Sequence, residues 1–513
     1  MIFYFFLVKS MKIRPLAIGG KKSGHVGFFR FLVVEDRVRS KVDSIHFTDS
    51  LYHAINSSTT MIGSILLPAP APLLSHRHPR RPGPPWSVSK QGQRFISTVI
   101  ATDSEDISAT HRLLRKFVAS SSKHVALSTL SHLLSPNTLN HRLSSLALPL
   151  YLEISEASWF DWNSKLVADL VALLYKLERF DEAEILVTET VSKLGSRERD
   201  LCSFYCQLVH SQSKHNSERG VLDFCTKLKL VLLCSSSVYL KQRGYASMVD
   251  AFCSIGLPRE AEALMEEMKE LGLKLSKFEF RALVYSYGQS GYFGDMKRIV
   301  VEMESMGFQL DTVSSNMVLN SFGSHNELSE VVSWLQKIEA SGVPFSIRTY
   351  NSVLNSCPTI SLLLQDPKSV PLSLEELMGN LDENEAALVK ILVGSSVLEE
   401  TMQWKPSELK LDLHGMHLSS AYVIILQWFH QLQCKFLAEN LVIPAEITVV
   451  CGAGKHSVVR GESPVKGLIK EILLRAGCPL RIDRKNVGCF IAKGKIFMEW
   501  LANYNATIHE RIS

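Results

Sequence analysis

The stretch QRGYASMVDAFCSIGLPREAEALMEEMKELGLKLS, residues 242–276, is followed without a gap by two blocks of equal length, 277–311 and 312–346, and a fourth begins at Ile347. Each block has 35 residues, with an apolar pair at its seventh and eighth places and Gly at its thirty-first. These residues are Met248-Val249, Leu283-Val284, Val318-Leu319 and Val353-Leu354, with Gly272, Gly307 and Gly342. Self-similarity of this period predicts a solenoid of stacked units.

Each block has the pattern of a helical hairpin. The first helix carries the apolar pair and ends at Gly256, Gly291 or Asn326, residue types that accept a left-handed backbone at a helix C-terminus. The second helix ends at the shared glycine. Because neither helix can bury its apolar side alone, neighbouring hairpins must stack, and residues of the first helices then line a concave face. We expect the binding surface on that face.

The blocks resemble the pentatricopeptide repeat family of plant organelle RNA-binding proteins, whose motif has the same length; RTYNSVL at 348–354 is one such stretch. The related tetratricopeptide repeat fits less well. Its Trp-x-x-Leu-Gly-x-x-Tyr signature is absent, and its shorter period would shift the matching positions. The resemblance implies an all-α array with single-stranded RNA as its partner.

In the family that these blocks resemble, the fifth and last residues of a repeat face a base edge, and the second packs against the base. The fifth-and-last pairs here are Ala246 with Ser276, Arg281 with Asp311 and Asn316 with Ser346, and Asn351 takes the fifth place of the last, partial block. An Asn amide both donates and accepts, which suits a pyrimidine edge, and the family pattern favours C at Asn316/Ser346. A mutual salt bridge is an equal alternative for Arg281 and Asp311.

Upstream of residue 242 the period weakens but continues, with one block starting near Ser164 and another at about 202–241. We therefore predict repeats over 164–356, preceded by a helical lead-in over 103–163. With one base per repeat, such an array reads too few bases to single out one transcript, so another element must add specificity.

The N-terminal part differs in composition from the rest. Residues 1–102 hold 14 Lys and Arg against 4 acids, leaving 42 against 47, so the remainder is acidic by five. Residues 61–102 contain no acid, which predicts an organelle transit peptide, of chloroplast rather than mitochondrial type, cleaved within 99–102. Residues 1–60 fit this poorly and are a doubtful extension, with Met61 as an alternative start. Disorder of the whole of 1–100 is the alternative interpretation.

Composition also limits the class of protein. A chain of 513 residues has room for two or three domains. Its apolar runs are all too short to span a bilayer, so membrane insertion is not expected. The ten cysteines form no Cys-x-x-Cys pair, which argues against a zinc ribbon or a secreted disulfide framework, and no metal site is predicted.

After Cys357 the period ends. Residues 357–406 contain four prolines and predict a linker with one acidic helix. Residues 407–495 show a βαβαββ order of strand and helix patterns, and a closing helix and tail occupy 496–513. We therefore predict a multidomain fold, in which an all-α helical-hairpin solenoid precedes a two-layer α/β domain.

Three motifs of this second domain resemble the small MutS-related domain, in the expected order: LDLHG at 411–415, CGAGKHS at 451–457 and NVG at 486–488. Cys451 stands where the family usually has Thr or His. The resemblance implies a domain that acts on nucleic acid. Region 452–495 agrees with this, because it carries ten Lys and Arg against three acids; a solvated basic face without a ligand is the alternative.

The residue types also indicate this chemistry directly. Two glycines ahead of a lysine let backbone N–H groups approach a phosphate, and basic side chains follow in the same loop. The residues of this loop are Gly452, Gly454, Lys455, His456 and Arg460.

Asp412 and His414 lie two apart at a strand end and share one face. His414 can act as general base on an RNA 2′-hydroxyl or as general acid on the leaving oxygen, with Asp412 fixing its tautomer and Lys455 and Arg460 stabilising charge on phosphorus. A magnesium route with Asp412 as one ligand stays open. The alternative is a domain that docks RNA without cutting it.

Two functions follow. The first is that of an organellar protein that binds single-stranded RNA sequence-selectively and acts in RNA processing or stability. Its terminal domain would hold or cleave RNA. Other organellar RNA-processing proteins would be further partners. The second is a non-catalytic RNA and protein scaffold of the plastid gene-expression machinery. DNA nicking is a third hypothesis, because a basic loop does not distinguish RNA from DNA.

Overall fold

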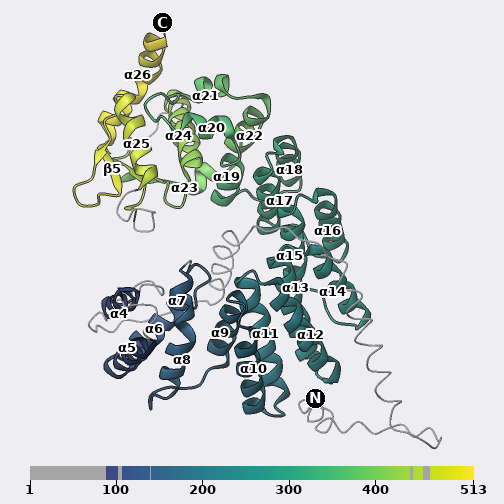
Figure 1. Ribbon diagram of the computed structural model, residues 1–513. Coiled ribbons are helices and arrows are strands. Elements are labelled where there is room, and N and C mark those ends of the chain that lie inside the picture. Colours follow the sequence, from purple (N-terminus) through teal and green to yellow (C-terminus); the bar gives the residue numbers. More distant parts are fainter. Residues whose placement is uncertain (1–87, 102–106, 139, 439–442, 455–462, 513) are drawn as a thin grey trace, which may run out of the picture. The chain divides into compact units, whose positions relative to one another are not determined.

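The computed structural model describes residues 88–101, 107–138, 140–438, 443–454 and 463–512 (Figure 1). They divide into two compact units, Met1–Ala282 and Leu283–Ser513, with the boundary inside a helix of the repeats. The predicted extension 1–60 and the leader as far as residue 87 lie outside the described residues. Among the helices described, none is long and apolar enough to cross a membrane.

The first unit begins with a group of short helices. They are α4 (Lys90–Ala101), α5 (Ile107–Ser120), α6 (Lys123–Leu133), α7 (His141–Ser145) and α8 (Ala147–Ser155). Helix α4 packs on α5 and α6: the Phe95 and Phe117 rings stack with centroids 4.1 Å apart, and Val99 is 1% exposed. The end of the predicted transit peptide 61–102 is therefore a packed helix, and a cut within 99–102 would separate this helix from its partners.

Three helical hairpins complete the first unit. They are α9 and α10 (Ser164–Lys176, Phe180–Leu194), α11 and α12 (Glu198–Lys214, Glu218–Cys234), and α13 and α14 (Val238–Ser254, Pro258–Glu270). The paired apolar residues Met248 and Val249 are fully buried. First helices pack on one another, α9 on α11 and α11 on α13, as in a solenoid.

The hairpins continue into the second unit. Helix α15 (Lys277–Gln289) contains the boundary, and it is followed by α16 (Phe293–Ser305), α17 (Thr312–Ser324), α18 (Leu328–Ala340), α19 (Ile347–Leu354) and α20 (Pro358–Leu363). The predicted left-handed residues are confirmed, because Gly256, Gly291 and Asn326 have φ angles of 76°, 75° and 60°. The last hairpin is shortened, since α19 has 8 residues.

Residues 357–406 differ from the linker that the prolines suggested. They form α20, α21 (Leu374–Asn380), α22 (Glu383–Val393), α23 (Val397–Thr401) and β1 (Met402–Trp404). Many of their apolar side chains are buried, Leu377, Leu388 and Leu392 completely, and α22 packs on α18 and α19. This segment is therefore a folded connection between the repeats and the α/β domain.

The α/β domain has the expected βαβαββ order with one extra strand. Its elements are β2 (Glu408–Asp412), α24 (Leu418–Ala438), β3 (Glu446–Val450), α25 (Pro464–Arg475), β4 (Arg481–Ile482), β5 (Cys489–Lys493) and α26 (Gly494–Ile512). The sheet order is β1-β2-β3-β5-β4, with β2 and β3 parallel and the other pairs antiparallel. Strand β2 alternates buried Leu409 and Leu411 with half-buried Lys410, as expected when helices cover one face of a sheet.

Candidate nucleic-acid interface

The three motifs of the α/β domain meet at one edge of the sheet. Because β2 and β3 are parallel, their carboxyl ends lie side by side, and the Leu413 N–H donates to the Val450 carbonyl oxygen at 2.8 Å. Strand β5 runs the other way, so its start is at the same edge, where the Cys451 N–H donates to the Gly488 carbonyl oxygen at 2.9 Å. The fold thus brings together the residues at which the motifs were found.

Asp412 holds His414 at this edge. Asp412 Oδ1 accepts the His414 backbone N–H at 3.0 Å and lies 3.3 Å from His414 Nδ1. The His414 side chain is 75% exposed and that of Asp412 34%. With Nδ1 turned toward the carboxylate, Nε2 is the nitrogen presented to a ligand, which is the arrangement needed for proton transfer by a positioned imidazole.

The glycine loop lies beside this pair. Gly452 and Gly454 have φ angles of 78° and 66°, and Gly488 is packed so closely that a Cβ there would lie 2.9 Å from the Gly452 carbonyl carbon. Burial raises the pKa of the neighbouring Cys451 thiol to about 12, so this group is neutral at neutral pH. The predicted residues Lys455, His456 and Arg460 lie outside the described residues.

Two arginines of the predicted basic face donate hydrogen bonds to backbone carbonyl oxygens of the protein. Arg475 donates from Nη1 to the Val370 carbonyl oxygen at 2.7 Å, and Arg481 donates from Nη1 to the Cys478 carbonyl oxygen at 2.7 Å. Through these bonds the two guanidinium groups hold the backbone in place. Lys466 lies nearer the edge, because Ser463 caps α25 there and donates from Oγ to the Cys451 carbonyl oxygen at 3.2 Å.

In the repeats, the last residue of each block serves as a helix cap. Asp311 Oδ1 accepts the Ser314 N–H at 2.9 Å, and Ser346 Oγ accepts the Thr349 N–H at 3.3 Å. Ser276 stands before α15, where its N–H donates to Glu279 Oε2 at 2.8 Å. A contact to RNA at these places would have to share the side chain with the capping hydrogen bond.

The fifth-place residues differ in their surroundings. Asn316 is half-buried on α17, and its Oδ1 is buried without a hydrogen-bond partner among the described residues. Ala246 on α13 and Arg281 on α15 are half-buried as well. A buried acceptor without a partner is costly, and a base could reach this oxygen only if the Asn316 side chain turned outward.

Asn351 does not fit the predicted base-reading role. It is only 9% exposed, its Nδ2 donates to the Gly415 carbonyl oxygen at 3.1 Å, and its Oδ1 accepts the His417 N–H at 2.9 Å. Both ends of the amide are used within the protein. A base at this place would therefore have to displace the contacts of Asn351 with the loop after His414.

Sequence reasoning also overlooked two residues of α15. The Tyr285 hydroxyl and the Gln289 amide nitrogen are buried without a partner in the described part of the chain. Both lie on a first helix, beyond the fifth place that the family pattern considers. Because both atoms are buried, a base could reach them only if their side chains turned outward.

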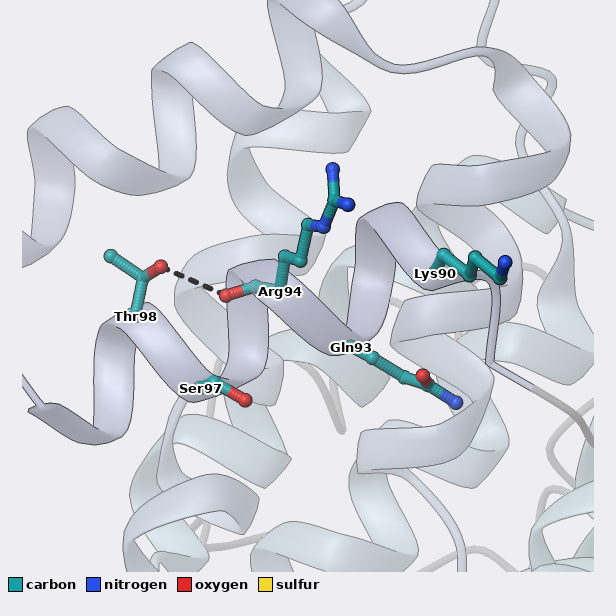
Figure 2. A pocket seen from close by; sticks show the side chains of 5 residues that line it. All are labelled: Lys90, Gln93, Arg94, Ser97 and Thr98. Carbon is teal, nitrogen blue, oxygen red and sulfur yellow. Dashed lines mark hydrogen bonds between the residues drawn. The ribbon is translucent and has the colours of Figure 1, made fainter.

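The remaining features do not form a second site. A shallow hollow of about 700 Å³ on α4 is shown in Figure 2, lined by Lys90, Gln93, Arg94, Ser97 and Thr98. All five side chains come from one helix, so no other element closes over a ligand. Within the described residues, no group of three or more His, Cys, Asp or Glu side chains is placed to hold a metal ion.

The comparisons with known proteins identify the class of protein. The family model "PPR repeat" matches residues 245–273, 280–308 and 313–343. A relative, pentatricopeptide repeat-containing protein At2g17033 of Arabidopsis thaliana, is 54% identical over 415 residues, which are 81% of this chain and 82% of the relative. The chain therefore belongs to the pentatricopeptide repeat family.

Other similar proteins share less of the chain. Pentatricopeptide repeat-containing protein At1g74750 of Arabidopsis thaliana is 27% identical over 125 residues, 24% of this chain and 14% of that protein. The crystal structure of the pentatricopeptide repeat protein PPR10 from maize is 13% identical, covers 74% of this chain and 51% of its own, and has a TM-score of 0.37. PPR10 in complex with an 18-nt psaJ RNA element is 12% identical, with coverages of 76% and 57% and a TM-score of 0.31.

Proposed function

We propose that this protein selects a short single-stranded RNA sequence with its repeats and holds or cleaves the same RNA with its C-terminal domain, in organellar RNA processing or stability. The place of Asn316, a half-buried amide whose Oδ1 has no partner among the described residues, carries the first part. It lies on a first helix of the second unit, at the fifth place of its block, and an amide can pair with a base edge by donating and accepting. Membership of the pentatricopeptide repeat family also supports RNA binding by the repeats.

The Asp412–His414 pair supports the second part, in which the terminal domain is of the small MutS-related type. His414 would take the proton of a 2′-hydroxyl, whose oxygen then attacks phosphorus. The bond from phosphorus to the 5′-oxygen breaks, which leaves a cyclic phosphate on one product and a 5′-hydroxyl on the other once that oxygen is protonated. Asp412 holds the imidazole in orientation, as its 3.3 Å contact with Nδ1 indicates.

The test uses the full chain, its His414→Ala form and its Asn316→Ala form with end-labelled organellar RNA, with and without magnesium. New ends made by the unchanged protein and lost in His414→Ala support cleavage. Protection of the RNA without new ends supports a domain that grips RNA only. RNA binding that is unaffected by Asn316→Ala would contradict the assigned role of this residue.

The alternative function is a non-catalytic scaffold of the plastid gene-expression machinery. Four large apolar side chains at the junction of α12 and α13 favour it, because Leu230, Leu233, Val238 and Tyr239 are 52%, 69%, 67% and 60% exposed. Exposed apolar side chains close together often mark protein contacts. A partner that stays bound after nuclease treatment and is lost on Leu233→Ser would support the scaffold.

The proposed compartment is the chloroplast, with the mitochondrion as the alternative. It rests on the acid-free composition of 61–102. A fluorescent protein fused behind residues 1–102 should be imported into chloroplasts. Retention of the fusion in the cytosol would contradict both compartments.

A further inference from the structure

We propose that Asn351 is a positioning residue that fastens the loop after His414 to the last repeat, so that His414 meets an RNA phosphate at a fixed offset from the base at Asn316. The RNA part of this inference rests on the proposed function. The attachment itself rests on contacts within the second unit and can be tested without RNA.

The attachment is a pair of hydrogen bonds made by one side chain. Asn351 donates to the Gly415 carbonyl oxygen at 3.1 Å and accepts from the His417 N–H at 2.9 Å, so it bridges a donor and an acceptor of the loop. Asn355, the residue that caps the C-terminus of α19, hydrogen-bonds through Nδ2 to the His417 ring. The bridge begins at the residue directly after His414 and therefore limits the motion of its backbone.

The residue type at position 351 is well matched to this task. Only a side chain with both a donor and an acceptor can satisfy the Gly415 carbonyl and the His417 amide together. An aspartate would keep the bond from His417 and lose the bond to Gly415. An alanine would lose both and leave two backbone groups unpaired.

Helix α19 is itself held firmly. Tyr350 is fully buried, and its hydroxyl donates to the Leu392 carbonyl oxygen at 2.5 Å. Helix α19 packs on α17, α22 and α24, and the Gln427 amide of α24 donates to the Val393 carbonyl oxygen at 2.8 Å. Asn316 on α17 and the loop after His414 are thus joined through packed helices rather than through a flexible segment.

Two consequences follow for RNA. The last block cannot read a base at its fifth place, so base reading in this unit ends at Asn316 and Ser346. The next contact along the strand is then the phosphate met by His414, and its distance from the last base read is set by the attachment of the loop to α19.

The first experiment measures hydrogen exchange of the loop in the full chain without RNA, comparing wild type, Asn351→Ala, Asn351→Asp and the control Asn320→Ala. Asn320 is exposed on α17. Loss of the bridge should speed exchange of the His417 amide about tenfold in Asn351→Ala, with a smaller change in Asn351→Asp and none in the control. Equal exchange in wild type and Asn351→Ala would overturn the attachment. Unchanged exchange of β3 shows that the variants are folded.

The second experiment uses synthetic single-stranded oligo(A) carrying a single cytosine and maps protected phosphates or new ends. In wild type they should lie at one offset from the cytosine. In Asn351→Ala they should spread over neighbouring nucleotides while affinity stays within about threefold. A changed base preference beside the cytosine, with the offset kept, would show that Asn351 reads a base and overturn the inference. No protection or ends on any RNA by wild type would refute the proposed function and the offset, while the exchange result would still decide the attachment.

Discussion

Replacing Gly488 by alanine would place a methyl group between the two loops that form the edge of the sheet. Its Cβ would lie 2.9 Å from the Gly452 carbonyl carbon and 3.0 Å from the Ala453 nitrogen. These are backbone atoms, and the hydrogen bond of 2.9 Å from the Cys451 N–H to the Gly488 carbonyl oxygen ties the loops together, so relief requires a shift of the main chain. Overpacking of this kind typically costs about 1–3 kcal/mol, and we expect about 2 kcal/mol, or roughly thirtyfold in the opening equilibrium.

The assay for Gly488→Ala is native-state hydrogen exchange of β3 and β5 in the full chain, which reports the α/β domain separately from the repeats. The matched control is Gly467→Ala in α25, where a Cβ would meet nothing within 4 Å. Alanine is favoured over glycine inside a helix by about 0.5–1 kcal/mol, so the control should slow exchange slightly. Unchanged exchange in Gly488→Ala, or equal acceleration in both variants, would refute the argument that this close approach requires glycine.

Four further outcomes are expected. Asn316→Ala should weaken binding of cytosine-containing single-stranded RNA by about 1 kcal/mol, roughly fivefold in a filter-binding assay, because alanine cannot pair with a base edge. Asp412→Asn should slow any cleavage, as timed on end-labelled RNA, without weakening RNA binding, because the amide no longer holds His414 as a carboxylate does. Burial raises the pKa of Asp250 from its ordinary value of 3.8 to about 6. Between pH 3.8 and about 6 the folded first unit therefore binds more protons than the unfolded chain, so its stability falls as the pH rises through this range. Asp250→Asn should remove this pH dependence. In denaturant unfolding it should stabilise the unit at neutral pH by up to about 3 kcal/mol. Under the proposed import, N-terminal sequencing of the mature protein should place the processed end before Lys90, because a cut within 99–102 divides packed helix α4.

The repeat register was sufficient to predict the hairpins because local chemistry determines where their helices end. Glycine or asparagine at a fixed place in each block adopts the left-handed backbone conformation there, as Gly256 and Asn326 do. The strand-end motifs were equally readable. Parallel pairing of β2 with β3 brings Asp412 beside the glycine loop, and this follows from a strand, helix, strand order alone.

The register could not predict contacts between residues that are distant in sequence. Asn351 occupies the same place in its block as Asn316, and nothing local distinguishes them, yet a loop more than sixty residues further on covers Asn351. The prolines of 357–406 suggested a linker, but they stand at places where a folded segment accepts them. Pro358 stands at the first position of α20, where a missing N–H costs little, and the Pro371 carbonyl oxygen accepts from the Tyr422 hydroxyl at 2.9 Å.

The direct attachment of the terminal domain bears on how an acidic chain would bind RNA. Beyond residue 102 the chain holds 42 basic against 47 acidic residues, so general attraction to a polyanion cannot supply the affinity. Under the proposed function, base reading at Asn316 and phosphate contact at His414 are two weak contacts whose spacing is fixed by α19. Once the base contact has formed, the phosphate contact is intramolecular. Its effective concentration is highest when the connection between the two sites is rigid. A fixed spacing also adds selectivity beyond that of a small number of base contacts. Only an RNA that presents a base and a phosphate at this offset satisfies both contacts.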